Sequence, residues 1–405
     1  MADSRFRWLH PLPALGAFLL AGLMVAASTS SFAQGGFQTL APHAILVDGE
    51  SGTVLFEKAA DEPTAPASMA KTMTVEIVFR EIAKGRINLD TEFTISEGAW
   101  RRGGGGSGGS SMFAQVNSSI KLSDLLRGII VQSGNDASIA VAEGIAGTEE
   151  NFARMMTERA RELGMARSTF RNATGYGHPE QKTTVRDLAK LAAHIIQTYP
   201  ELYKIFGERE FTWNKIRQQN RNPLLAMEIG ADGLKTGNID EAGFGLIGSA
   251  VQNGQRLIVV VNGLKTARDR AAEARKLLDW GFRAFEARQL FAENEPVGEA
   301  QVFGGTTRSL PLVSPKPIRV LMPRGSNDRL SAKIVYTGPL KAPVQKGMQV
   351  GRLQVNRGDM QALELPLYAG ADVAEGSMSQ KALDGLLEVG GDLIRRAFAS
   401  LTNRG

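Results

Sequence analysis

The strongest constraint on the fold is a hairpin signal late in the chain. Two apolar, strand-like runs, AGFGLIGSAVQ and QRLIVVVNG, flank the dipeptide Asn253-Gly254, which is a preferred pair for a tight two-residue turn. Near the N-terminus two further apolar runs, HAILVD and TVLFEK, are separated by GESG and also indicate a hairpin. Segments with helical periodicity lie between these pairs. We therefore expect an α/β (α+β) domain over residues 34–287, an antiparallel sheet completed by both ends of the domain and flanked by helices.

The sequence pattern changes twice after this domain. From about Arg288, short apolar runs alternate with Pro, Gly and Asn turns, which predicts a small all-β domain over 288–375. The last segment, 376–405, has apolar residues at helical spacing and predicts a C-terminal amphipathic helix. Its positive charges are Lys381, Arg395, Arg396 and Arg404. A basic amphipathic helix can lie on an anionic membrane or dock on its own domain, and the pattern leaves both open.

The first 33 residues are typical of an export signal peptide. Arg5 and Arg7 precede the apolar run ALGAFLLAGLMVAA, and Ser31 and Ala33 occupy the small-residue positions before a cleavage site. An N-terminal membrane anchor is the alternative, but the run is short for a membrane span. We therefore expect an exported, periplasmic protein that the C-terminal helix attaches peripherally to the outer face of the cytoplasmic membrane.

Composition excludes several kinds of function. The net charge of +5 over 405 residues is mild, which argues against a nucleic-acid binder with its dense basic patch. Cysteine is absent, so disulfides, thiol nucleophiles and cysteine metal sites are excluded. The histidines beyond the leader, His43, His178 and His194, are far apart in the sequence. We expect neither a metal site nor another cofactor.

A serine and a lysine form the first polar motif. Ser68-Met69-Ala70-Lys71 stands at the start of a predicted helix over Ser68–Lys84 that Gly85 ends. Residues i and i+3 share a helix face, so the two polar side chains lie together. The helix is apolar around them, and burial lowers the pKa of a lysine towards the neutral form that can act as a base. The alternative is that Ser68 only caps the helix.

Two more motifs follow. Ser133-Gly134-Asn135 lies between two predicted helices, where it can present a hydroxyl and an amide to a cleft. Lys235-Thr236-Gly237 lies on a strand-like segment, with a positive charge, a hydroxyl and a glycine that allows close approach of a peptide to the strand edge. Taken alone, Ser133 and Asn135 fit a simple turn, and Lys235 fits a charge that protects a sheet edge. The ordered set of three is far more specific.

A glycine-rich run, RRGGGGSGGSS, precedes the second motif. It contains literal matches to G-x-G-x-x-G and G-x-S-x-G, but it lacks the strand before and the helix after that these signatures require. We therefore expect a mobile surface loop near the cleft.

Together the three motifs resemble those of the penicillin-recognising serine enzymes, S-x-x-K, S-x-N and K-T-G. Within that group the chain is similar to the D-alanyl-D-alanine carboxypeptidases, the low-molecular-mass penicillin-binding proteins. The resemblance is strong from Ala44 to Ala287 and includes the strings LLRGIIVQSGNDASIAVAEGIAG, FTWNKIRQQNRNPLL and DGLKTGNIDEAGFGLIGSA. It implies a β-lactamase/transpeptidase-like fold for the first domain.

The resemblance also implies a mechanism. Ser68 would attack the carbonyl between the two terminal D-alanines of a peptidoglycan stem pentapeptide, with Lys71 as general base. Ser133 would pass a proton to the departing D-alanine, and water would then hydrolyse the acyl-enzyme. β-Lactam antibiotics would acylate the same serine and inhibit the enzyme. The backbone N–H groups of Ser68 and Asn238 would form the oxyanion hole. The implied substrate-binding residues are Asn135, Lys235, Thr236, Gly237, Asn238 and Arg270.

Three other functions compete with this one. A serine β-lactamase of class A would carry an E-x-x-L-N element, which is absent between Ser133 and Lys235. A DD-endopeptidase that cuts cross-links uses the same motifs, although the appended β-rich domain and terminal helix favour a carboxypeptidase. A non-catalytic, wall-binding scaffold would not need Ser68 and Lys71 intact. The one departure from the family in these motifs is Asn238, where relatives often carry His.

Overall fold

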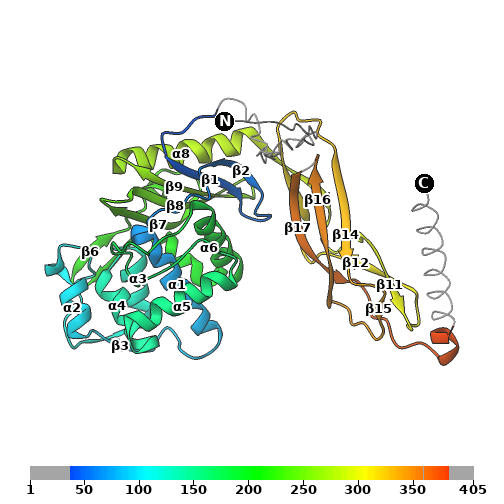
Figure 1. The fold of residues 1–405 in the computed structure, drawn as a ribbon, viewed down its shortest axis with the longest axis horizontal. Coiled ribbons are helices and arrows are strands. Elements are labelled where there is room, and N and C mark those ends of the chain that lie inside the picture. The colour runs from blue at the N-terminus through cyan, green and yellow to red at the C-terminus, as the bar shows by residue number, and fades with distance from the viewer. Residues whose placement is uncertain (1–36, 359, 383–405) are drawn as a thin grey trace, which may run out of the picture. The chain divides into compact units, whose positions relative to one another are not determined.

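The computed structural model describes residues 37–358 and 360–382 (Figure 1). The predicted signal peptide and most of the predicted C-terminal helix lie outside these residues. Within the described ranges, no helix is both long and apolar enough to cross a membrane.

The first domain is built on a five-stranded antiparallel sheet in the order β2-β1-β9-β8-β7. Its strands are β1 (His43–Asp48), β2 (Val54–Lys58), β7 (Ala231–Ile239), β8 (Gly243–Gln252) and β9 (Gln255–Leu264). The N-terminal hairpin pairs with the later strands through β1 and β9, and β8 and β9 turn at Asn253 and Gly254, both at positive φ. The predicted sheet, completed by both ends of the domain, is therefore confirmed.

Helices cover both faces of this sheet. Figure 1 shows α8 (Ala267–Ala284) on one side and the helical layer with α1 and α6 on the other. That layer consists of α1 (Lys71–Ala83), α2 (Glu97–Gly103), α3 (Leu122–Ile130), α4 (Asn135–Ala146), α5 (Glu149–Glu162), α6 (Val185–Thr198) and α7 (Pro200–Tyr203). Single-turn 3₁₀ segments are η1 (Ala67–Ala70), η2 (Gly105–Ser107), η3 (Lys204–Gly207) and η4 (Pro223–Ala226). Two short hairpins, β3–β4 (Glu92–Thr94, Ser119–Lys121) and β5–β6 (Glu210–Trp213, Ile216–Gln219), complete the domain.

One apolar cluster joins the sheet to the helices. Ile45 of β1 and Val260 of β9 pack with Phe79 of α1 and Leu126 of α3, all fully buried. The first half of helix α1 is buried on every side in this cluster, as its mostly apolar sequence predicts. The central position of α1 holds the residues at its N-terminal end against a rigid core.

The second domain is entirely β. A six-stranded sheet has the order β14-β16-β17-β12-β11-β15, and β10 pairs with β13. The strands are β10 (Phe285–Phe291), β11 (Gly298–Phe303), β12 (Ser309–Val313), β13 (Ile318–Pro323), β14 (Leu330–Tyr336), β15 (Leu340–Lys341), β16 (Gln349–Arg357) and β17 (Met360–Ala369). Its own small apolar core includes Leu312, Leu353 and Leu367. The all-β prediction for this part of the chain is confirmed.

Candidate active site

Ser68 lies in the 3₁₀ turn that precedes α1, so the predicted helix is divided into η1 and α1. The helix-cap alternative fails, because neither η1 nor α1 has a side-chain cap hydrogen bond. The residue before the serine, Ala67, has a positive φ of 48°, an uncommon conformation for a non-glycine residue. A Cβ on Gly175 would lie 1.9 Å from the carbonyl oxygen of Ala67. Close backbone packing at Gly175 therefore holds the turn that presents Ser68.

Lys71 is completely buried beside the serine. Its Nζ donates hydrogen bonds to Ser68 Oγ (3.0 Å), Asn135 Oδ1 (2.7 Å) and the carbonyl oxygen of Thr174 (2.5 Å). Burial lowers the pKa of Lys71 to about 7, and the Arg221 cation adds to this effect. The lysine can therefore lose its proton near neutral pH.

Ser133 and Lys235 form a second hydrogen-bonded pair. Ser133 sits between α3 and α4 with a positive φ of 67°, and Lys235 lies on β7. Lys235 Nζ donates to Ser133 Oγ at 2.9 Å and to the carbonyl oxygen of Thr236 at 3.2 Å. Burial and the nearby Lys71 cation hold the pKa of Lys235 well below its ordinary value.

A cleft of about 720 Å³ lies next to these two pairs. Its lining includes Ser68, Ser133, Asn135, Thr236, Gly237, Asn238 and Arg270, so the predicted site residues from three distant motifs meet at one place. The cleft is large enough for a peptide terminus, since ligand pockets commonly measure about 300–1,000 Å³.

Gly237 has a packing role that its sequence position did not reveal. A Cβ at this position would lie 3.0 Å from the carbonyl oxygen of Pro66 and 3.1 Å from the side chains of Ala67 and Met69. The glycine therefore lets β7 lie directly against η1. Asn238, the next residue, is exposed at the cleft.

Two arginines line the same cleft. Arg270 of α8 stands over the Phe244 ring, with Cζ 5.7 Å from the centroid, and its buried Nε has no hydrogen-bond partner among the described residues. Arg221 follows the β5–β6 hairpin and was not predicted, although it lies in the family-like string FTWNKIRQQNRNPLL. Burial lowers the pKa of each guanidinium. Within the described ranges neither arginine is paired with a carboxylate, so the cleft is a place for an anion.

Comparisons with known proteins agree with this geometry. A family model described as D-alanyl-D-alanine carboxypeptidase matches residues 28–266. The chain belongs to this family. A second model, described as the C-terminal domain of penicillin-binding protein 5, matches residues 285–375. The family and the fold expected from the sequence are thus confirmed.

Individual relatives of this carboxypeptidase family resemble the chain over most of its length. D-alanyl-D-alanine carboxypeptidase DacC of Escherichia coli (strain K12) is 39% identical over 343 residues, 84% of this chain and 86% of that protein. The crystal structure of penicillin binding protein 5 from Haemophilus influenzae has a TM-score of 0.73 at 35% identity, covering 84% of this chain and 99% of that one. Penicillin-binding protein D2 from Listeria monocytogenes, in its ampicillin-bound form, has a TM-score of 0.55 at 28% identity, covering 61% and 99%.

Sequence reasoning missed Thr174 as well as Arg221. Thr174 contributes a backbone carbonyl to the carboxypeptidase cleft, and a backbone atom has no residue-type signature. Only the approach of the 172–176 segment to η1 in the folded chain reveals it.

Proposed function

We propose that this protein removes the terminal D-alanine from peptidoglycan stem pentapeptides through an acyl-enzyme on Ser68. The observation that carries the proposal is the 3.0 Å contact between Lys71 Nζ and Ser68 Oγ in a buried setting. Membership of the carboxypeptidase family supplies the substrate class.

The hydrogen bonds of Lys71 favour a role as general base. A lysine ammonium has three N–H donors, and three acceptors surround it. Two of these, Asn135 Oδ1 and the Thr174 carbonyl oxygen, have no hydrogen to donate. When Lys71 is neutral, its two N–H bonds stay on these two oxygens, and its lone pair faces the hydroxyl of Ser68. The neutral lysine is thereby oriented to accept the proton of the attacking serine.

Ser133 and Lys235 fit the departure of D-alanine. The Ser133 hydroxyl accepts from Lys235, so its own proton is directed away from that lysine and is available to the leaving amine. We expect the amine to take this proton while Ser133 recovers one through the buried lysines. Water then hydrolyses the ester to restore Ser68.

The cations of the cleft fit the terminal carboxylate of the substrate. Arg221 and Arg270 line the cleft, and Thr236 adds a hydroxyl there. The buried Lys235 is close enough to both arginines for their charges to lower its pKa. Mutual repulsion between Lys71 and Lys235 disfavours two charges on the pair. A bound carboxylate favours the charged form of Lys235, which leaves Lys71 as the neutral base. The backbone N–H groups of Ser68 and Asn238, both at the cleft, are the proposed oxyanion hole.

Covalent labelling by a fluorescent penicillin tests the nucleophile. We expect stoichiometric labelling of the wild-type protein and none of Ser68→Ala, because the labelled bond forms on Ser68 Oγ. The ampicillin-bound Listeria relative supports the choice of probe. Equal labelling of the two proteins would exclude Ser68 as the nucleophile.

Release of D-alanine tests the substrate. We expect D-alanine from a soluble stem pentapeptide, with cross-linked dimers left intact. Cleavage of dimers at a comparable rate would instead identify the protein as a DD-endopeptidase, and rapid turnover of the penicillin label would identify a β-lactamase.

We further propose that the protein is exported and peripherally attached to the cytoplasmic membrane through residues 376–405. The support is the leader-like sequence of residues 1–33 and the basic, amphipathic pattern near the C-terminus. Truncation after Gly376 should release the protein from anionic vesicles without loss of penicillin labelling. Unchanged vesicle binding would rule out this attachment.

A further inference from the structure

The glycine-rich run before Ser133 is an exposed segment whose two ends pack against the site. Its first residues, Arg101 to Gly103, end helix α2, and Gly105–Ser107 form η2. A Cβ on Gly103 would lie 2.3 Å from the backbone nitrogen of Asp136, and one on Gly109 would lie 2.7 Å from Asn135 Nδ2. The run therefore packs closely around Asn135, one of the three acceptors of Lys71, while Gly105 to Gly109 are exposed, and Gly108 and Gly109 line the cleft.

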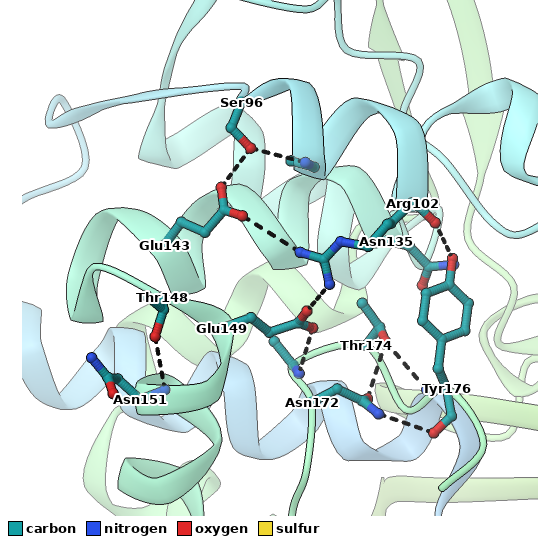
Figure 2. Close-up of polar contacts among 12 residues, drawn as sticks. Ser96, Arg102, Asn135, Glu143, Thr148, Glu149, Asn151, Asn172, Thr174 and Tyr176 are labelled. Carbon is teal, nitrogen blue, oxygen red and sulfur yellow. Dashed lines mark hydrogen bonds and ion pairs between the residues drawn. The ribbon is translucent and has the colours of Figure 1, made fainter.

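The backbone carbonyl of Arg102 is linked to Asn135 through the hydroxyl of Tyr176. The Tyr176 hydroxyl donates to the Arg102 carbonyl oxygen at 2.6 Å, and Asn135 Nδ2 donates to the Tyr176 oxygen at 2.9 Å (Figure 2). With Nδ2 held by the tyrosine, the other end of the amide, Oδ1, points to Lys71. The Tyr176 hydroxyl thus fixes which atom of Asn135 faces the lysine.

The Arg102 guanidinium is linked through Glu149 to a second acceptor of Lys71, the Thr174 carbonyl oxygen. Its Nη1 pairs with Glu149 at 2.5 Å, and Glu149 Oε1 accepts the backbone N–H of Ala173 at 3.1 Å (Figure 2). The next residue, Thr174, supplies the carbonyl oxygen that accepts from Lys71. The guanidinium also lies 3.5 Å from Glu143 of α4, so Arg102 ties α2 to both α4 and α5.

We propose that Arg102 and Tyr176 are positioning residues for the general base. They hold the two oxygens that orient the N–H bonds of Lys71, and they keep its lone pair on Ser68. The inference rests on the proposed role of Lys71 and assigns the end of α2 a part in the acylation step.

Stability alone does not explain these contacts. The Arg102 side chain is 51% exposed, while its partners Glu149 and Glu143 are 11% and 24% exposed. Solvent screens the guanidinium, so these pairs contribute less to folding than a fully buried pair would. Arg101 on the same helix offers a matched comparison, since it is also exposed and, among the residues that the structure describes, pairs only with Glu97 one turn away. Loss of Arg102 should therefore change the rate of chemistry more than the melting temperature.

The test measures penicillin binding and acylation separately in Arg102→Ala, Tyr176→Phe and Arg101→Ala. Saturation kinetics with a fluorescent penicillin give the dissociation constant and the first-order acylation rate. The rate is taken at pH 9, above the pKa of about 7 for Lys71, so that changes in protonation do not contribute. We expect Arg102→Ala and Tyr176→Phe each to acylate about 10-fold more slowly, part of the 10²–10⁴-fold that a positioned base provides. Dissociation constants and melting temperatures should stay near wild type, and Arg101→Ala should match wild type throughout.

Three results would overturn the inference. An unchanged acylation rate in both Arg102→Ala and Tyr176→Phe would show that these contacts do not assist acylation. A larger dissociation constant for Tyr176→Phe at an unchanged acylation rate would show that Tyr176 binds the ligand instead. An equal loss in Arg101→Ala would reflect general damage to α2. Absence of labelling in wild type, by contrast, would refute the proposed function itself, so the two failures are distinguishable.

Discussion

The acylation of Ser68 should depend on pH through Lys71. Burial lowers the pKa of this lysine to about 7 from 10.5, so about half of it is neutral at pH 7. An ordinary lysine would be neutral in roughly one molecule in 3,000 at that pH. Burial therefore raises the population of the base by about three orders of magnitude, from the same relation.

The expected profile follows from this pKa. Below pH 7 the lysine gains its proton, and the acylation rate should fall about 10-fold per pH unit. At pH 5 the neutral fraction is about 1%, so acylation should be about 50-fold slower than at pH 7. Stopped-flow labelling with a fluorescent penicillin between pH 5 and 9 measures this, because the penicillin carboxylate stays ionised throughout.

Removing a positive charge near Lys71 tests the direction of its pKa shift. The Arg221 cation lowers the pKa of Lys71, so Arg221→Gln should raise it and move the acid limb to higher pH. Arg217→Gln is the control, since Arg217 is exposed and pairs with Glu210 in a surface hairpin, and it should leave the midpoint unchanged. A wild-type rate that is flat from pH 5 to 8, or a midpoint that Arg221→Gln does not move, would refute the assignment of Lys71 as the base.

Two further perturbations test the packing around the site. Gly175→Ala places a Cβ against the carbonyl oxygen of Ala67, on a residue whose φ is +87°. Urea unfolding should show a loss of more than about 1 kcal/mol of stability, and penicillin labelling should show slower acylation. Glu76→Gln removes the charge of a fully buried carboxylate whose partner is Arg159 at 2.8 Å, and it should cost about 3 kcal/mol in urea unfolding. Burial raises the pKa of Glu76, but hydrogen bonds from His194 and Arg159 lower it overall. The ionised carboxylate therefore stabilises the folded protein at a pH above its unfolded pKa of 4.5. This contribution is lost as the pH falls through the lower pKa of the folded state. A Glu76→Gln protein as stable as wild type at pH 7 would contradict this account.

Local sequence was enough for the elements of the fold and for the motifs. The Asn253-Gly254 turn and the apolar runs beside it specify a hairpin through backbone conformation and side-chain alternation, both of which act over a few residues. The order of strands and helices then leaves few ways to close the sheet. The Ser68 and Lys71 pair could be recognised because both side chains belong to one turn.

Only the tertiary structure decided what surrounds that pair. The Thr174 carbonyl, Arg221 and the end of α2 come to Lys71 from segments far apart in the sequence, and no local pattern specifies their approach. The same holds for the pKa of Lys71, since burial and neighbouring charge exist only after the chain has folded. The sequence by itself determined which groups could react. The packing of distant backbone determined that one lysine is buried, oriented and neutral enough to be a base.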